Sequence, residues 1–330
     1  RGRLFLAKLA ALVHEHFDDA VASAPTQRVA LGVGAAMSQG ATSWVLVEDR
    51  PDRGLGVALT WALRQNAEHL HVLVPDRAGE LARRASEFDL DITVWSTAQS
   101  GTTLARATPE PFVEQAEVDG RHLAFADVIL DSGAEVVVEH GVVCGEVRGL
   151  EVCRVVTDPM SGDCRLEVGV GAHDREAFGL LHGDAPTAES LRRIVDVVAA
   201  HRRGGADPHP LNRLGAERAL RARLIAEPSL VDASFLRWAA PATPRPNLKD
   251  PVPCVAVGDS RSGQPVVVVC STGVDIDVVP FAGEARLFHG APDTELVIAV
   301  PERDATSLTR QLAGTLRHPA RVVGLASGVA

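Results

Sequence analysis

Short runs rich in Val, Ile and Leu recur along the chain, and segments with a helical spacing of apolar residues separate them. Residues 69–74 and 91–95 form two such runs, and residues 78–87 between them have the pattern of a helix. Strands that alternate with helices build sheets that contain parallel pairs and carry helices on their faces. The sequence therefore predicts an α/β fold in which mixed sheets are flanked by helices.

Chain length and two polar stretches predict more than one domain. The chain has 330 residues, which is more than a single hydrophobic core usually organises. Residues 96–111 and 202–210 are rich in Gly, Pro or small polar residues, a composition typical of linkers. We therefore predict an α/β domain at 1–100, a middle α+β domain at 112–201 and a second α/β domain at 211–330. The middle domain is predicted to open with a helix at 112–130.

The net charge and the cysteines argue against several classes of protein for this chain. The formal net charge of -10 argues against a general nucleic-acid coat or a membrane-surface binder. No apolar run reaches the ~18 residues that a membrane span needs. The five cysteines include no Cys-x-x-Cys pair, which excludes a zinc ribbon and favours reduced thiols. The composition predicts a soluble, cytoplasmic protein without a membrane partner, and it leaves the oligomeric state open.

Two segments near the ends of the chain match each other. Residues 71–77 read HVLVPDR and residues 297–303 read VIAVPER, so a strand ends in Pro-acid-Arg in both places. A helix and another strand are predicted after each. Internal duplication of an α-β-β-β-α-β module would explain the match. The alternative is that similar local patterns arise in any α/β protein without duplication.

This order of elements, and above all the closing strand–helix–strand unit at 296–325, resembles the PD-(D/E)XK nucleases, the restriction-endonuclease-like superfamily. The resemblance covers residues 214–325 and, more weakly, residues 3–95. In this family an acid ends one strand, a Glu-x-Lys lies on the next, and the carboxylates hold Mg²⁺ that activates the attacking water. The resemblance implies a metal-dependent nuclease-like protein in nucleic-acid metabolism or its regulation, with nucleic acid as a partner.

Each of the two modules carries a different part of the family's motif. Asp259 ends a predicted strand in the last segment, but the next strand, at 266–271, reads VVVVCS and has neither Glu nor Lys. In the first segment Glu48 and Arg50 take the place of Glu-x-Lys, with Arg instead of Lys. Arginine is a permanently charged planar fork, so the exchange is not neutral. The resemblance therefore implies an incomplete catalytic motif.

Two glutamates in the middle segment are further candidates for catalysis and for Mg²⁺ binding. Glu151 and Glu167 lie in consecutive predicted strands, and carboxylates on adjacent strands suit a hard cation. The alternative is that both simply face solvent. A separate His/carboxylate metal site could be formed by His173, Asp174, Glu176, His182 and Asp184 together with Glu139 and His140 upstream. A surface loop with capping acids would explain residues 173–184 as well.

Arg53, Gly54 and Gly56 precede or begin a predicted helix at 56–66. A helix N-terminus attracts anions through its free backbone N–H groups and its dipole, and a nearby arginine adds to that attraction. These residues predict a binding site for a nucleotide or another anion. The alternatives to a nuclease-like protein are therefore a non-enzymatic sensor for such a ligand, or an interaction scaffold.

Overall fold

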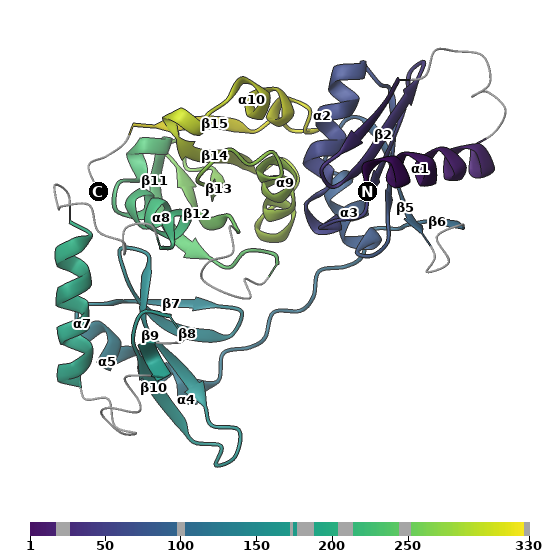
Figure 1. Cartoon of the computed structure of the whole chain (residues 1–330). Helices are drawn as coiled ribbons and strands as arrows, with labels where there is room; N and C mark the ends of the chain where they lie inside the picture. Colours follow the sequence, from purple (N-terminus) through teal and green to yellow (C-terminus); the bar gives the residue numbers. More distant parts are fainter. Residues whose placement is uncertain are drawn as a thin grey trace. The chain divides into compact units, whose positions relative to one another are not determined.

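The structure is a computed structural model that describes residues 1–17, 27–97, 103–171, 174–176, 188–203, 214–243 and 252–326. Its strands form three sheets with helices packed beside them, which confirms the predicted α/β class (Figure 1). Each sheet draws its strands mainly from one of the three predicted domains. Whether those segments fold independently stays a prediction.

The chain divides into two compact units. The first unit comprises Arg1–Phe112, Val274–Leu296 and Ala305–Val322. The second comprises Val113–Gly273, Val297–Asp304 and Val323–Ala330. Among the helices of the described residues, none is long and apolar enough to cross a membrane.

The first sheet has six strands in the order β1-β2-β3-β4-β5-β6. Strand β2 pairs antiparallel with both β1 and β3, and β4 pairs parallel with both β3 and β5. Strand β6 is antiparallel to β5. The strands are β1 (Gln27–Leu31), β2 (Gly34–Gln39), β3 (Thr42–Val47), β4 (His69–Val74), β5 (Asp91–Thr97) and β6 (Leu104–Arg106). The helical elements of this segment are α1 (Gly2–His16), η2 (Pro51–Arg53), α2 (Leu55–Gln65) and α3 (Ala78–Ala85).

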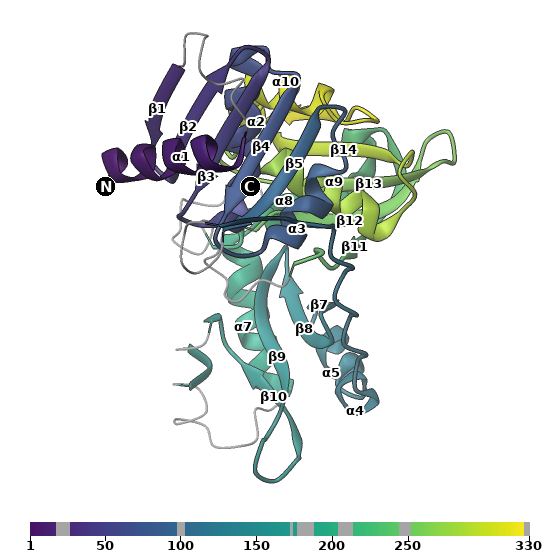
Figure 2. The ribbon, with the colours of Figure 1, turned by 90° about the vertical axis from the view of Figure 1, so that its right-hand side faces the viewer.

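Helix α1 lies across β1, β2 and β3 on one face of this sheet (Figure 2). Its apolar residues Leu9, Leu12 and Val13 are buried against alternate strand residues, among them Trp44 and Leu46. Successive strand side chains point to opposite faces, so the residues between these face α2 and α3. Each fully buried Leu contributes about 1.5–3 kcal/mol, which makes α1 an apolar cover for the sheet.

Helices α2 and α3 pack against α9 (Val278–His289) and α10 (Ser307–Gly314), which also belong to the first unit. Helix α9 is buried from Val278 to Arg286, so it is central to this layer of helices. Pro280 lies in its first turn, where a proline removes no intrahelical hydrogen bond. This helix was not predicted, because Pro280 and Gly283 interrupt its pattern and its apolar residues have no clear amphipathic period.

The middle sheet is antiparallel, with four strands in the order β10-β9-β8-β7. Its strands are β7 (Glu135–Glu139), β8 (Val142–Val147), β9 (Leu150–Thr157) and β10 (Cys164–Val168). The helices are α4 (Gly120–Leu123), α5 (Ala126–Asp131) and α7 (Ala188–His201). Leu191, Val195 and Val198 of α7 pack on the apolar side chains of β9 and its neighbours.

The third sheet has five strands in the order β11-β12-β13-β14-β15. The strands are β11 (Ala233–Ala239), β12 (Cys254–Ser260), β13 (Pro265–Cys270), β14 (Glu295–Pro301) and β15 (Arg321–Leu325). The helical elements are α8 (Ala216–Ala226), η4 (Pro228–Val231) and η5 (Glu302–Asp304). Leu224 of α8 is fully buried in the core that this sheet forms within the second unit.

Several local predictions were wrong. The predicted linker at 96–111 contains β6, an edge strand that a short polar sequence can form once β5 offers free backbone groups. The helix predicted at 112–130 is reduced to α4 and α5, because Val113 is 88% exposed and Asp119 caps a helix that begins only at Gly120. Strands β2, β8 and β11 were missed, since Gly, Ala and charged residues weaken their strand pattern.

Candidate functional site

Glu48, the predicted first-module carboxylate, directly follows β3 and forms an ion pair with a residue of α1. Lys8 Nζ donates to Glu48 Oε1 over 2.7 Å. Arg50, at the expected lysine position, has a left-handed backbone with φ of 52° and leads into η2. The lysine beside the glutamate therefore comes from the first helix rather than from the strand. Sequence spacing could not reveal this pair, because 40 residues separate its members.

Asp259, the predicted acid of the last module, is exposed near the end of β12. In the pairing register Pro265 of β13 lies opposite it, and Phe235 of β11 lies on its other side. Strand β13 is buried from Val266 to Cys270 and carries no carboxylate. The third sheet thus places Asp259 beside apolar neighbours on both strands.

Arg53, Gly54 and Gly56 do lie at the N-terminus of α2, as predicted, and a carboxylate occupies the anion position. The Gly56 backbone N–H donates to Asp277 Oδ1 over 2.8 Å. Arg53 forms an ion pair with Asp275. The chain therefore supplies its own anions to this helix, from the turn before α9.

Burial raises the pKa of Asp277 to about 7, and the nearby Asp275 adds to the rise. The hydrogen bond from Gly56 and the charge of Arg53 act in the opposite direction. The two glycines allow close packing here. A Cβ on Gly56 would lie 2.5 Å from the Ile276 carbonyl oxygen, and one on Gly54 would lie 2.6 Å from a Val47 methyl group. Their presence reflects this packing as much as any affinity for anions.

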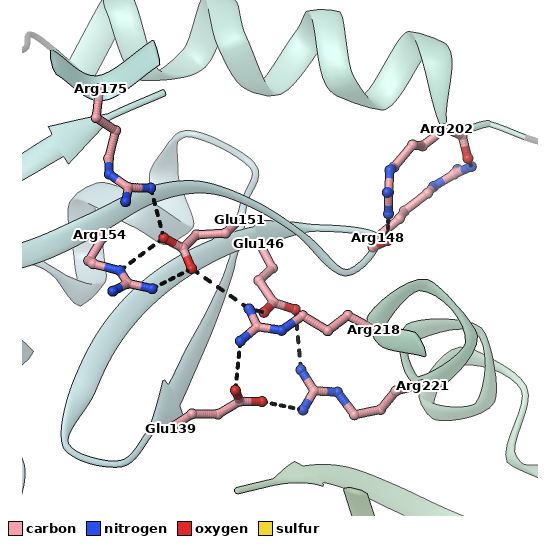
Figure 3. A network of polar contacts seen from close by, with 9 residues as sticks. All are labelled: Glu139, Glu146, Arg148, Glu151, Arg154, Arg175, Arg202, Arg218 and Arg221. Atoms are coloured by element: carbon pink, nitrogen blue, oxygen red, sulfur yellow. Dashed lines mark hydrogen bonds and ion pairs between the residues drawn. The ribbon is translucent and has the colours of Figure 1, made fainter. Parts of the chain in front are cut away.

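The two glutamates of the middle sheet lie on adjacent strands, as predicted, and share an arginine. Glu151 of β9 is fully buried and accepts hydrogen bonds from Arg154, both at 2.9 Å, and from Arg175 at 3.0 Å (Figure 3). Glu167 of β10 pairs with Arg165 at 3.0 Å, and Arg175 Nε lies 3.6 Å from it. The guanidinium of Arg175 therefore links the two carboxylates that were expected to share a metal ion.

This cluster continues into a buried network between the middle sheet and α8, all within the second unit (Figure 3). Arg218 and Arg221 are three residues apart, so they share one face of α8. Arg218 contacts Glu139 at 2.7 Å and Glu146 at 2.5 Å. Arg221 contacts the same two glutamates at 2.6 Å and 3.3 Å. Arg218 also lies 3.8 Å from Glu151, which joins the two halves of the network.

The electrostatics of the network keep its arginines charged. Burial lowers the pKa of Arg218 and Arg221, but the charges of Glu146 and Glu139 more than offset it, so both pKa values are raised. Each buried glutamate is in turn neutralised by at least one guanidinium. The arrangement ties α8 to β7, β8 and β9, because removing one member would leave a buried charge without its partner.

A second pair of arginines, Arg148 and Arg202, forms reciprocal hydrogen bonds in the same part of the second unit (Figure 3). Arg148 Nη1 donates to the backbone oxygen of Arg202 over 2.5 Å, and Arg202 Nη1 donates to that of Arg148 over 2.7 Å. Burial lowers the pKa of Arg202 to about 10. These reciprocal bonds join the end of α7 to the turn between β8 and β9.

Sequence reasoning missed a third cluster, formed by Asp119, His122 and Cys164. One possible ligand atom from each of these residues lies within 4.8 Å of the others. Asp119 caps α4 and His122 follows one helical turn later, while Cys164 begins β10 opposite Thr157. Thr157 Oγ1 lies 2.7 Å from His122 Nε2 and 3.6 Å from Cys164 Sγ. The Asp-x-x-His spacing was readable in the sequence, but only the β9–β10 hairpin brings in the cysteine.

The groups of this cluster differ in charge and burial. Hydrogen bonds from the Arg121 side chain and backbone lower the pKa of Asp119 to about 2, so it is ionised at neutral pH. His122 Nδ1 is buried without a hydrogen-bond partner. Cys164 is half-buried, whereas the other four cysteines are buried. An imidazole, a thiol and a carboxylate together are a ligand set for a transition metal.

The predicted site residues are thus distributed over several places. Glu48 belongs to the first unit, whereas Glu151, Glu167 and Asp259 belong to the second. Within the second unit Arg175 brings Glu151 and Glu167 together, and Asp259 lies on a different sheet. Of the alternative His/carboxylate metal site, His173, His182 and Asp184 lie outside the described residues. Glu139 of that set pairs with Arg218 and Arg221.

Comparison of the chain with models of protein families, with curated proteins and with solved structures gave no significant match. The likeness to the PD-(D/E)XK nucleases therefore rests on the order of elements alone.

Proposed function

We propose that this protein is a non-catalytic, nuclease-like scaffold that serves a regulatory role in nucleic-acid metabolism. The observation that carries the proposal is the set of partners around the predicted catalytic acids. Lys8 pairs with Glu48, and three arginines surround Glu151. A carboxylate that holds Mg²⁺ must offer its oxygens to the metal. Ion pairs use both oxygens of Glu151 and one oxygen of Glu48, which favours a structural role for these acids.

The scaffold consists, in this proposal, of two related modules. The first reads α1-β1-β2-β3-α2-β4-α3-β5, and the second reads α8-β11-β12-β13-α9-β14-α10-β15. The strands also have the same spatial order in the two sheets. This agreement covers eight elements in each module and supports the duplication inferred from the Pro-acid-Arg match.

Reciprocal contacts inside the first unit support the same view. Phe88, just after α3, forms an antiparallel bridge with Leu316, just after α10. The Asp89 N–H donates to the Thr315 carbonyl, and the Arg317 N–H donates to the Glu87 carbonyl. Equivalent positions thus exchange equivalent bonds, as they do across a two-fold axis. A contact of this kind is expected where a symmetric pair of modules has become one chain.

A nuclease assay tests the absence of catalysis. Single-stranded and double-stranded DNA and RNA are incubated with the protein and Mg²⁺ or Mn²⁺, beside the Glu48→Gln and Glu151→Gln variants. We expect no cleavage above the level of the variants. Cleavage that EDTA stops and that either substitution abolishes would overturn the proposal.

A thermal-shift screen tests the alternative of a nucleotide sensor. We expect no nucleotide to raise the melting temperature, because Asp275 and Asp277 already bind Arg53 and the N-terminus of α2. A nucleotide that stabilises the protein, and loses this effect with Arg53→Ala, would favour the sensor instead.

A further inference from the structure

We propose that Asp119, His122 and Cys164 form a binding site for a single zinc ion. The three residues offer a carboxylate, an imidazole and a thiol as ligands. Asp119 and His122 come from the cap and the helix of α4, and Cys164 comes from the start of β10. Zinc bonds of about 2.0–2.3 Å in tetrahedral geometry place ligand atoms roughly 3–4 Å apart. The present separations, all within 4.8 Å, are close enough for small side-chain rotations to complete the site.

The chemistry of the ligands selects the kind of metal. A thiolate and an imidazole favour zinc and its neighbours in the first transition row, whereas Mg²⁺ and Ca²⁺ prefer oxygen ligands. This site is therefore different in kind from the carboxylate Mg²⁺ site that the nuclease resemblance implies. It also stands independently of the proposed scaffold function.

Thr157 gives the site an outer support. Metal-bound histidines usually hold their second ring nitrogen in a hydrogen bond, which fixes the tautomer and the ring orientation. The Thr157 hydroxyl lies 2.7 Å from His122 Nε2 and supplies that bond. His122 Nδ1 remains buried and without a partner, so it is the nitrogen that is available to a metal. A buried ring nitrogen without a hydrogen-bond partner, in a cluster with a thiol and a carboxylate, is the observation that points to a bound cation.

Arg121 opposes metal binding and so provides a sharp control. Its Nη2 donates to Asp119 Oδ2 over 2.6 Å, and its Nε lies 3.1 Å from the same oxygen. A metal ion must compete with this guanidinium for the carboxylate. The Arg121→Gln substitution removes the competing charge, so it should strengthen metal binding if the site exists.

Three protein ligands leave a fourth tetrahedral position for water or an exchangeable ligand. The three residues are half-buried, which leaves the metal within reach of solvent. We therefore expect zinc to exchange readily, as suits a metal-responsive element rather than a permanently closed structural site.

Cobalt(II) is the probe for the first experiment, because a cobalt–thiolate bond has a characteristic charge-transfer absorption. The full chain, kept reduced, is titrated with Co²⁺ and then with competing Zn²⁺. We expect saturation at one equivalent and displacement by zinc. Cys164→Ser should abolish the absorption, His122→Ala should weaken binding at least tenfold, and Arg121→Gln should tighten it several-fold.

Asp163→Asn and His14→Ala are matched controls, since both residues are exposed and lie outside the cluster. Neither should change cobalt binding. If the absorption is absent, or if it persists in Cys164→Ser, the site does not exist as proposed.

Alkylation of the unmodified chain gives a second readout that needs no variant to fold. Cys164 is the most accessible of the five cysteines, so iodoacetamide should modify it first. Zinc at one equivalent should slow this reaction at Cys164 at least tenfold, as measured by mass spectrometry of the digested protein. Equal rates with and without zinc would overturn the proposal.

Discussion

The two proposed modules make a polar contact at the same place with different residues. In each, a residue just after the third strand is bonded to the first helix. In the first module Glu48 pairs with Lys8 of α1, and in the second Thr272 donates to Glu217 of α8 over 2.6 Å. The acid lies after the strand in one case and on the helix in the other. Both proposed modules thus bond the end of the third strand to the first helix, and they do so with different residue types.

The first helices differ in the same way. Helix α1 is held by an apolar face that contains Leu12, whereas α8 adds two buried arginines, Arg218 and Arg221, to its apolar contacts. An apolar face is indifferent to pH and salt. A buried ion-pair network is specific about its partners, and it is costly when one of them is lost.

The largest effect is expected from the network that holds α8. Arg221 is only 1% exposed, and Arg221→Met removes its guanidinium, so Glu139 and Glu146 each lose one of their two arginine partners. We expect a loss of about 3–5 kcal/mol in the free energy of unfolding, measured by urea denaturation. The control Arg223→Met, on the same helix but hydrogen-bonded at the surface, should cost less than about 0.5 kcal/mol. A loss below about 1 kcal/mol for Arg221→Met would mean that the network adds little.

The apolar contact of α1 should give the next largest effect. Leu12→Ala leaves a cavity under the helix, because this side chain is 2% exposed. We expect a loss of about 2–4 kcal/mol that is the same at low and high salt. The control Leu4→Ala, at a side chain that is 73% exposed, should be nearly neutral. Equal losses for the two variants would contradict the packing described for α1.

The contact between α2 and the turn before α9 should depend on pH. Asp277 has a pKa raised to about 7, so the folded state retains a proton that the unfolded chain loses above about pH 4. Its contribution to stability therefore falls as the pH rises from about 4 to about 7. Asp277→Asn keeps an acceptor for the Gly56 N–H and removes the charge. Relative to the unmodified protein, we expect this variant to gain about 1–3 kcal/mol at pH 8 compared with pH 5.

Chemical denaturation at the two pH values measures this change. Asp293→Asn, at an exposed acid of the same unit, is the control and should show no such gain. A pH-independent difference for Asp277→Asn would show that the carboxyl is ionised throughout this range.

The smallest effects are expected at the Lys8–Glu48 and Thr272–Glu217 bonds. Lys8→Met should cost less than about 1 kcal/mol, because the Lys8–Glu48 pair is partly exposed, and 1 M NaCl should reduce this cost further. Thr272→Val removes a hydrogen bond to a carboxylate and should cost about 1 kcal/mol with a weaker dependence on salt. Thermal unfolding at two salt concentrations separates the two cases. If salt changed the stability loss of Lys8→Met and of Thr272→Val equally, the two bonds would not differ in their electrostatic character as described.

Much of the fold could be predicted because strands such as β4 and β14 carry strong local patterns that end at Pro-acid-Arg. The elements that were missed, such as β2 and α9, have weak or ambiguous local patterns and depend on partners elsewhere in the chain. The same holds for the sites. Glu151 and Glu167 could be placed on neighbouring strands, but Arg175, which binds both, is brought to them only by the fold.

The sequence by itself determined the α/β class, most strands of the three sheets and the position of Gly54 and Gly56 at the start of a helix. Only the tertiary structure decided which charges meet. Lys8 reaches Glu48, Asp277 reaches Gly56, and Cys164 joins His122 across long sequence separations. Periodicity records local burial, residue by residue. Electrostatic and metal-binding partners depend on distances of a few ångströms in space, and no local pattern contains those distances.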